Sequence, residues 1–525
     1  MRKTVKKLTA VGLTVTSVLG LVACGSSKGT TSQGTSENKE VTKPDTFTVM
    51  CDGTVVTETN GAEAFYKQLN EATGLDIKWT RPDHASYYDA VANAFNSDDT
   101  MPDVVLLSSD YYALYASNGF LWNMTDAWEH SETKNSGRLI STADNVLSAL
   151  MVNGEDGTKA MYGLSLYRGN GCCTYVKKAW LDKAGIDASK VKDVQMDFNT
   201  YYGYLKQMAQ TMGHYVISSP GFIHPEAPNT NYLPEFYQKA QYTFYKDTSG
   251  KYVDGFAQQE MKEALQRIQT AVNDGVIDKE SVNNSTANAR DKFYSTDPST
   301  ETGVFTYWAG TWANTLKTNL ANKGLDDELI AIKPIKELGA YTERIAPCWC
   351  ITSAAKNPEG IFKYFIDKML DGGDVQMLWT HGAKGTHWDD KAETVTVEKK
   401  EDQPKTYTEG QFHYLPGIEK PDQWQTKNHI DPILSIANFT NGYVGESLIP
   451  EVARENGEFF AETSQVAVPL PMTSELSNNI GDINTARTYV IAQVALGYMT
   501  VDEGMDYYNK TVGSLSNAVL KSLNK

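Results

Sequence analysis

Two tryptophans, Trp308 and Trp312, flank the short segment Ala309–Gly310. An indole ring can stack against the C–H face of a sugar, whose hydroxyl groups also need hydrogen-bond donors and acceptors nearby. The chain is rich in aromatic rings that could do this, with ten tryptophans and 29 tyrosines. Core packing is the structural alternative for each tryptophan, and both interpretations stay open at this point.

Three charged residues could supply polar contacts to such a ligand. Asp52 and Asp110 can accept hydrogen bonds from vicinal hydroxyl groups, and Arg168 can donate to one. Each of them could equally cap a turn or form an ion pair at the surface.

Cysteines form a second group with chemical potential. The chain has six, of which Cys172 and Cys173 are adjacent, and Cys348 and Cys350 are separated only by Trp349. Zinc sites usually show wider spacing and nearby histidines. We therefore interpret these cysteines as small hydrophobic side chains on buried strands and expect no metal or other cofactor.

Signatures of catalysis are scarce in the sequence. No Gly-x-Ser-x-Gly elbow lies between a predicted strand and a predicted helix, and no His-Glu-x-x-His pair or Walker-type phosphate loop is present. A glycoside hydrolase would need two carboxylates at a defined separation, and 65 acidic residues do not single out such a pair. We expect a protein that is not an enzyme, with a secreted glycoside hydrolase as the alternative.

Strands alternate with helices in the first part of the chain. From hydrophobic periodicity, strands are predicted at 46–51, 75–79 and 103–107, and helices at 61–73 and 87–96. This alternation favours a parallel sheet with helical crossovers. Ligands bind beyond the carboxyl ends of the strands in such sheets, which puts Asp52 and the predicted turn Ser108–Asp110 at the rim of a site.

Similar patterns continue through the rest of the chain. Helices are predicted at 175–183, 200–212 and 261–272, hairpins at 242–253 and 394–407, and helices again from 485 to the end. Thr500, followed by Asp502 and Glu503, is typical of a capped helix N-terminus.

The N-terminus has the features of a secretory signal. Basic residues at positions 2, 3, 6 and 7 precede an apolar run from Leu8 to Val22 that is too short to span a membrane. The body after about residue 44 has roughly 480 residues, which exceed one hydrophobic core and favour two lobes. Removal of the signal takes the net charge from −17 to about −21, so nucleic acid is not an expected partner.

The segment Leu21–Gly25, with the sequence Leu-Val-Ala-Cys-Gly, resembles a bacterial lipobox. The resemblance implies a signal peptide at 1–23 and a lipid on the thiol of Cys24, the first residue of the mature protein. Residues 24–44 would then be a flexible polar tether that holds the protein to the extracytoplasmic face of the cell membrane. An ordinary secretory signal with a chance cysteine is the alternative.

Seven further short segments follow one another at characteristic spacing. They are Met101–Val105, Ala179–Ile186, Ala271–Asp278, Gly310–Trp312, Asn357–Glu359, His381–Trp388 and Thr500–Met505. In order and spacing they resemble the lipoprotein binding proteins of bacterial carbohydrate importers, the extracellular solute-binding family of the maltose-binding type, and in length its oligosaccharide-receptor branch. The likeness covers most of residues 46–525. It departs at Met196–Thr200, where the family usually has Pro-x-Thr.

This resemblance implies an α/β fold of two lobes with a central ligand cleft, the Venus-flytrap arrangement of periplasmic binding proteins. The chain is expected to cross between the lobes near Leu164, Pro334 and Gly382. The implied lobes are discontinuous, with 45–163 plus 334–382 in the N-terminal lobe and 164–333 plus 383–525 in the C-terminal lobe.

The resemblance also implies where a ligand binds. Trp308 and Trp312 lie in a loop whose family counterpart carries a sugar-stacking aromatic residue. Trp349 follows the second crossing, and His387 and Trp388 follow the third, which would aim all three at the cleft. The predicted ligand-binding residues are therefore Trp308, Trp312, Asp52, Asp110, Arg168, Trp349, His387 and Trp388.

By the same resemblance, the protein is expected to be a monomer that captures a sugar or oligosaccharide and delivers it to the permease subunits of an ABC transporter. A receptor for a peptide or another solute on the same fold is a further alternative, because fold does not choose the ligand.

Overall fold

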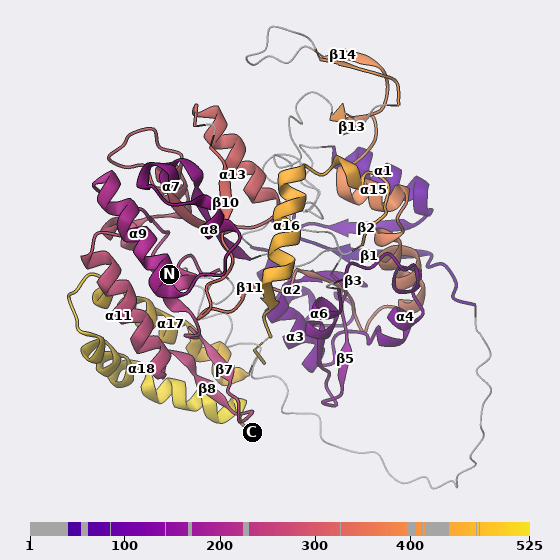
Figure 1. Cartoon of the computed structure of the whole chain (residues 1–525). Coiled ribbons are helices and arrows are strands. Elements are labelled where there is room, and N and C mark those ends of the chain that lie inside the picture. Colours follow the sequence, from indigo (N-terminus) through magenta and orange to yellow (C-terminus); the bar gives the residue numbers. More distant parts are fainter. Residues whose placement is uncertain are drawn as a thin grey trace.

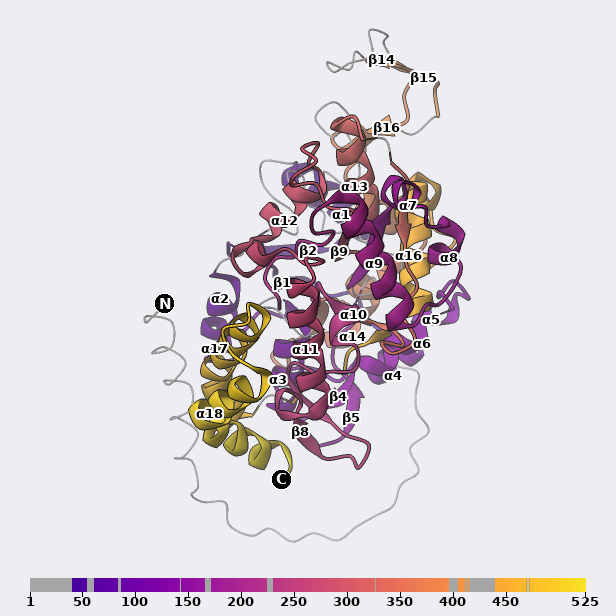
Figure 2. The same ribbon diagram turned by 60° about the vertical axis from the view of Figure 1, so that its left-hand side comes forward.

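The computed structural model describes residues 40–53, 61–83, 86–141, 143–165, 171–223, 230–325, 327–395, 405–410, 413–414, 440–468, 470–471 and 473–525. The predicted signal peptide, Cys24 and Arg168 lie outside these residues. Figure 1 shows two lobes, with β1–β3, α1–α4 and α6 on the right and α7, α9, α11, α17 and α18 on the left, and Figure 2 shows α17 and α18 side by side. The predicted α/β, two-lobed architecture is confirmed.

The first lobe is built on a four-stranded sheet. Its strands lie in the order β12 (Cys348–Ile351), β3 (Val104–Leu107), β1 (Thr46–Met50) and β2 (Asp76–Thr80). β1 is parallel to β2 and β3, and helices α1 (Ala62–Thr73) and α2 (Tyr87–Ala94) provide the crossovers. These three strands and two helices confirm the prediction. β12 comes from much later in the chain and pairs antiparallel with β3.

Shorter elements complete the first lobe around this sheet. They are α3 (Ser109–Ser117), α4 (Thr125–Glu129), α5 (Glu132–Asn135), α6 (Ala143–Ala149), β4 (Met151–Asn153), β5 (Lys159–Met161), α14 (Pro358–Ile361) and α15 (Asp374–His381). The predicted turn at Ser108–Asp110 is wrong in part, because the chain enters α3 at Ser109 directly after the strand.

The second lobe has an antiparallel three-stranded sheet. Its strands lie in the order β10 (Leu329–Ala331), β6 (Cys172–Lys177) and β9 (Val304–Trp308). The main helices are α7 (Lys178–Ala184), α9 (Phe198–Met212), α11 (Gln259–Asn273), α17 (Ser474–Ala495) and α18 (Val501–Leu523). The predicted helices at 200–212 and 261–272 are confirmed, and so is the capped start at Thr500, which forms a capping box with Glu503.

Both predicted hairpins are present. β7 (Phe244–Lys246) pairs with β8 (Tyr252–Asp254), and β14 (Glu393–Val395) pairs with β15 (Lys405–Tyr407). None of the helices among the described residues is long and apolar enough to cross a membrane.

The helix predicted at 175–183 is wrong in its first part. Residues 172–177 form β6, and the helix begins only at Lys178. All six residues of β6 are buried, because a central strand has neighbours on both sides and protein on both faces. A short strand that is buried on both faces cannot be told from a buried helix by periodicity alone.

The hydrophobic cores show how the chain is divided. One core takes buried residues from 47–164 and 345–383. The other two clusters, in the second lobe, take theirs from 172–341 and 460–519. The chain therefore changes core between Leu164 and Cys172 and again between Tyr341 and Ile345, a few residues beyond Pro334.

The five cysteines among the described residues are all buried. Cys172 and Cys173 lie in β6, and Cys348 and Cys350 lie in β12. Both strands are buried, as was predicted for these four cysteines. Burial disfavours the thiolate and raises the pKa of Cys173 and of Cys348 to about 12. These thiols are therefore protonated and poorly nucleophilic at neutral pH.

A buried ion pair joins the last two helices to β8. Arg487 of α17 is 0% exposed, and its Nη2 lies 2.8 Å from Oδ1 of Asp254. Tyr508 and Ser516 of α18 each donate a hydrogen bond of 2.6 Å to Oδ2 of the same carboxylate. The side chain of Asp254 thus joins β8 to two helices whose contacting residues lie 233 and 254 positions later in the chain.

We predict that Asp254→Asn lowers the free energy of unfolding by about 3–5 kcal/mol, because it leaves the buried guanidinium of Arg487 without a counter-charge. Urea denaturation followed by circular dichroism measures the change. Asp182→Asn is the matched control, since its partner Lys178 and Asp182 itself are 38% and 55% exposed and the free energy should stay nearly constant. Equal losses in the two variants would contradict the prediction.

Candidate functional site

A tight turn connects β9 to α13 (Thr311–Asn322) and carries the two predicted tryptophans. Gly310 has φ 67° and ψ −121°, a conformation that glycine adopts readily and other residues rarely do. Trp308, the last residue of β9, and Trp312, in the first turn of α13, are both half-buried. They pack at the margin of the third core cluster, so each ring keeps part of its surface accessible.

Helix α16 (Glu451–Thr463) holds this turn in place. Oδ1 of Asn456, which is 8% exposed, accepts hydrogen bonds from the backbone N–H of Gly310 at 2.7 Å and from the hydroxyl of Tyr175 at 3.0 Å. Phe460 of the same helix belongs to the cluster beneath the tryptophans. Sequence reasoning missed Asn456, because these partners lie 146 and 281 residues away and no local pattern marks it.

Each tryptophan is paired with an arginine that the sequence did not single out. Cζ of Arg344 lies 4.8 Å from the centre of the Trp308 ring, and Cζ of Arg290 lies 5.2 Å from that of Trp312. Arg290 also lies 5.6 Å from the ring of Tyr307, and its Nη1 donates a 3.2 Å hydrogen bond to the Tyr307 hydroxyl. We call this aromatic and cationic cluster the tryptophan wall: Trp308, Trp312, Tyr307, Arg290 and Arg344, of which Tyr307 is buried.

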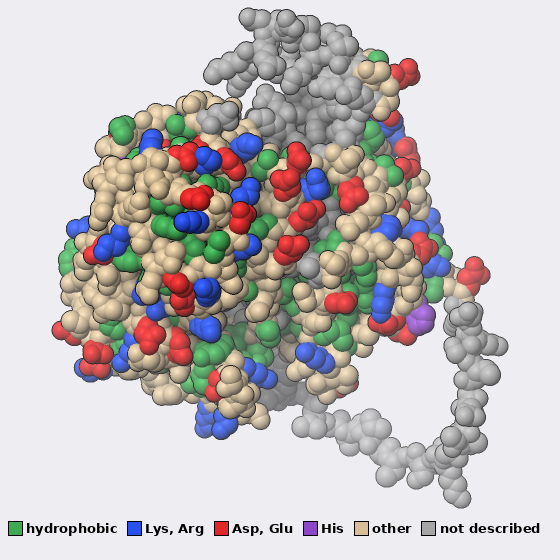
Figure 3. Space-filling model, viewed as in Figure 1, with side chains coloured by type: hydrophobic (Ala, Val, Ile, Leu, Met, Phe, Trp, Pro, Cys, Tyr) green, Lys and Arg blue, Asp and Glu red, His purple; other side chains and the backbone are tan. Residues whose placement is uncertain are grey.

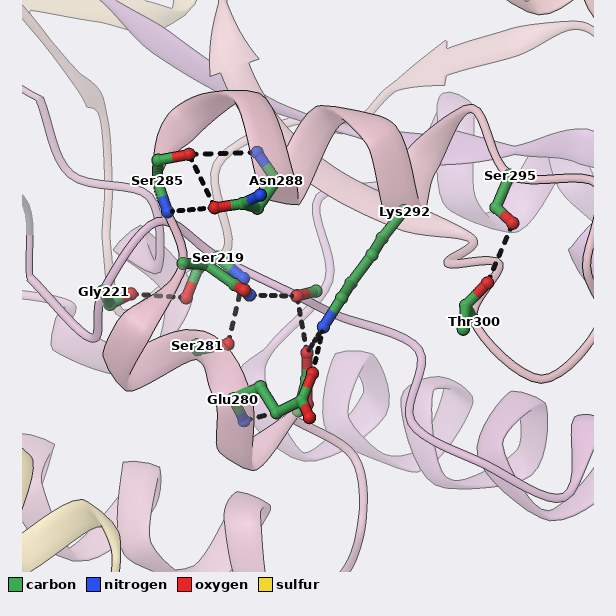
Figure 4. A network of polar contacts seen from close by, with 12 residues as sticks. Ser219, Gly221, Glu280, Ser281, Ser285, Asn288, Lys292, Ser295 and Thr300 are labelled. Atoms are coloured by element: carbon green, nitrogen blue, oxygen red, sulfur yellow. Dashed lines mark hydrogen bonds and ion pairs between the residues drawn. The ribbon is translucent and has the colours of Figure 1, made fainter.

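Arg290 is carried by α12 (Thr286–Phe293), whose two ends are anchored (Figure 4). At the N-terminus, Ser285 and Asn288 form a reciprocal capping box. Near the C-terminus, Nζ of Lys292 lies 2.7 Å from Asp278 and 2.8 Å from Glu280. A helix held at both ends presents Arg290 in a defined position.

The first lobe contributes polar and aromatic groups at the carboxyl ends of its parallel strands. Asp52 follows β1, and the rings of Tyr88 and Tyr111 stack with centroids 4.0 Å apart and planes 7° apart. The backbone N–H of Ser108, after β3, donates to the Tyr88 hydroxyl at 2.9 Å. Burial raises the pKa of Tyr88, and the nearby charge of Asp52 raises it further. Asp110 lies in α3, but its side chain is outside the described set.

His387 lies against the start of α1 in the first lobe, and Trp388 follows it in the chain. His387 is 2% exposed, and its Nδ1 accepts a 2.7 Å hydrogen bond from the backbone of Ala383. A Cβ on Gly61 or Gly382 would come within about 3 Å of its ring, so this histidine is enclosed by backbone. Trp388 is half-buried, and its Nε1 donates to the carbonyl of Gly382 at 2.8 Å.

Trp349 belongs to the core, in contrast to the expectation that it faces the cleft. It is 3% exposed, and its ring packs on Phe365 and Trp379 with centroids 5.9 and 5.7 Å apart. The reason is its place in β12, all four residues of which are buried. Proximity to a crossing between lobes therefore did not predict the direction of this side chain.

Comparison with solved structures identifies the fold. An N-glycan transport solute-binding protein from Streptococcus pneumoniae matches with a TM-score of 0.58 and 17% identity over 91% of this chain and 98% of that chain. The chain has the solute-binding-protein fold. An HMO-binding, ABC-transporter-associated solute-binding protein from Bifidobacterium longum infantis matches with a TM-score of 0.57 and 13% identity over 91% of this chain and 98% of that chain.

A family 1 extracellular solute-binding protein from Alicyclobacillus acidocaldarius gives a TM-score of 0.57 and 14% identity over 91% of this chain and 100% of that chain. No protein-family model and no curated protein sequence matches the chain. The likeness to solute-binding proteins is therefore one of three-dimensional structure.

In this solute-binding-protein fold, the described ends of two connections between the cores lie in contact. The backbones of Leu164 and Trp349 exchange hydrogen bonds of 3.0 and 2.9 Å. Gly171 lies so close to Thr342 that a Cβ would stand 2.1 Å from its carbonyl oxygen, so no larger residue fits. These contacts form a narrow junction next to Arg344 and the tryptophan wall.

A buried carboxyl group lies under this junction. Glu235 in α10 (Pro234–Tyr237) is 1% exposed, and its Oε1 accepts hydrogen bonds from Thr174 at 2.7 Å and from Tyr341 at 3.3 Å. Burial raises the pKa of Glu235 to about 7, while the hydrogen bonds from Thr174 and Tyr341 act in the opposite direction. The adjacent pocket, of about 60 Å³, has room for a few water molecules but not for a sugar.

We predict that the free energy of unfolding falls between pH 4.5 and pH 8 in the unchanged chain and falls less in Glu235→Gln. The unfolded carboxyl group ionises near pH 4.5 and the folded one only near pH 7, so the unchanged chain loses stability between these values and stays lower above them. The glutamine variant lacks this loss, which amounts to roughly 2–3 kcal/mol. Urea denaturation across this pH range measures it, and a difference between the two proteins that does not change with pH would contradict the prediction.

Proposed function

We propose that this protein is a lipid-anchored extracellular solute-binding protein of the carbohydrate-binding family. It captures a sugar or an oligosaccharide between its two lobes and delivers it to the permease subunits of an ABC transporter. It binds the sugar without cleaving it and acts as a monomer.

The tryptophan wall is the observation that carries this proposal. It offers two half-buried indoles, held by a glycine turn and by Asn456, together with the N–H donors of two guanidinium groups. Aromatic faces beside polar groups suit a sugar, which has C–H faces and hydroxyl groups. The wall lies next to the junction between the lobes, where a ligand could touch both of them.

The first lobe supplies a second, smaller set of groups. Asp52 and the stacked pair Tyr88 and Tyr111 lie at the carboxyl ends of β1 and β3, the edge where ligands bind in open α/β sheets. A sugar held by both sets favours the closed arrangement of the lobes over the open one. Trp388 is a further candidate, because this residue is half-buried.

The structures with the same fold support a transport role. Their names describe N-glycan transport in one case and an ABC-transporter-associated, HMO-binding protein in another. These are binding proteins, which favours capture over catalysis. Their low identity to this chain means that the sugar bound here need not be the same.

The N-terminal sequence supports the anchor. Cys24 follows a secretory signal within a lipobox-like segment, and the first strand of the folded body begins only at Thr46. The polar residues between them are long enough to let the body move above a membrane. Cys24 is also separate from the five buried thiols of the folded body.

We predict that the mature body, residues 25–525, is stabilised by an oligosaccharide and leaves it intact. A ligand that binds only the folded state must raise the melting temperature. A thermal-shift screen against plant and host oligosaccharides, followed by chromatography of the sugar, measures both properties. Cleavage of the sugar would contradict the receptor function and would indicate a glycoside hydrolase. If no sugar raises the melting temperature but a peptide does, the protein is a receptor for a peptide and not for a sugar.

We predict that Trp308→Ala and Trp312→Ala each raise the dissociation constant of the sugar found in that screen roughly tenfold. A loss of about 1.4 kcal/mol of stacking free energy corresponds to that factor. Isothermal titration calorimetry measures the dissociation constants. Tyr498→Ala is the control, because this ring is 72% exposed and lies outside the wall. Unchanged affinity in both tryptophan variants would remove the wall from the binding site.

We predict that Cys24→Ser releases the protein from the membrane. In a bacterial host that processes lipoproteins, the unchanged chain should incorporate an alkyne-labelled palmitate and sediment with membranes. The serine variant should carry no label, because it lacks the thiol that is acylated. Label that persists in the variant, or an unlabelled parent chain, would favour an ordinary secretory signal.

A further inference from the structure

Arg290 and Arg344 differ from three other arginines of the second lobe, of which Arg267 donates from Nε to the backbone carbonyl of Phe236 at 2.7 Å. Buried Arg487 pairs with Asp254, and exposed Arg454 lies 3.5 Å from Glu458. Among the residues that the structure describes, no carboxylate lies within ion-pair distance of Arg290 or Arg344. In a chain with 65 acidic and 48 basic residues, arginines without a carboxylate partner need an explanation.

The unused donors of these arginines point to an anionic ligand. A guanidinium held over a ring is stabilised through its charge and keeps its N–H groups for other partners. Within the described part of the chain, Nε of Arg344 is buried and has no hydrogen-bond acceptor. Toward other described residues, the side chain of Arg290 uses one donor, on the Tyr307 hydroxyl. Buried donors are normally satisfied, so a bound molecule is a natural source of the missing acceptors.

The position of both arginines connects them to the proposed sugar site. Each lies over one of the two tryptophans, and these tryptophans belong to one turn. A planar guanidinium matches the two oxygens of a carboxylate better than it matches a single hydroxyl group. Both acidic and basic side chains are spread over the surface in Figure 3, and the whole chain carries a charge of −17. An acidic sugar therefore needs local cations to bind at all.

We propose that the ligand of the tryptophan wall is an oligosaccharide that carries a carboxylate, with Arg290 and Arg344 as its specificity-determining residues. This inference rests on the proposed function and names the sugar class that the site selects. The carboxylate can belong to a uronic acid or to a sialic acid, since both offer the same group to a guanidinium.

The test is calorimetric titration of the mature body with two matched pairs of probes. Trigalacturonate is compared with galactotriose, and 3′-sialyllactose is compared with lactose. We expect one acidic probe to bind at least tenfold more tightly than its neutral counterpart, with an affinity that falls as salt is added. The acidic probe that binds distinguishes the uronic from the sialic source.

Variants assign this preference to the two arginines. Arg290→Gln and Arg344→Gln should each lower affinity for the acidic probe at least tenfold and leave neutral sugars nearly unaffected. Arg344→Lys keeps the positive charge but not the paired N–H donors of the guanidinium. Its affinity for the acidic probe should therefore fall less than that of Arg344→Gln. Arg454→Gln is the control for removal of an exposed arginine. Melting curves without ligand verify that each variant is folded.

Three outcomes would overturn the inference. The first is that an acidic probe and its neutral partner bind equally tightly. The second is that the preference for the acidic probe persists in both glutamine variants. The third is that neither acidic probe binds. If neutral oligosaccharides bind while both acidic probes are silent, the proposed function stands and only the ligand class falls. If no sugar in the wider screen binds, both proposals fail.

Discussion

The pairing of β12 with β3 is the constraint on which the rest of the structure depends. Residues 348–351 return from the second lobe and form an antiparallel ladder with 104–107. β3 is fully buried, so without this partner one of its edges would leave backbone N–H and C=O groups unpaired inside the protein. The first sheet is therefore complete only after the chain has built most of the second lobe.

That return brings several distant groups to one place. The chain passes Thr342 beside Gly171 and Trp349 beside Leu164, so outgoing and returning segments touch. Arg344 lies between Tyr341, which packs in the second lobe, and Ile345, which packs in the first. Its guanidinium lies 4.8 Å from the centre of the Trp308 ring, so the candidate site and the junction between the lobes are parts of one arrangement.

Buried polar groups give the second lobe its fixed internal order. Asp254 binds side chains from α17 and α18, and Lys177, 1% exposed, lies 2.8 Å from Glu301. Glu235 joins β6 to the returning chain through Thr174 and Tyr341. Each of these groups is costly to leave without its partners, so alternative packings of the same helices are disfavoured.

The sequence by itself determined the elements whose signals are local. Periodicity marked β1, β2, β3, α1 and α2, turn residues marked the hairpins, and Thr500 marked the start of α18. Only the tertiary structure decided that 175–177 is a strand, that Trp349 is core, and that Arg290, Arg344 and Asn456 surround the tryptophans. Local propensity depends on near neighbours, whereas these positions depend on contacts between segments far apart in the chain.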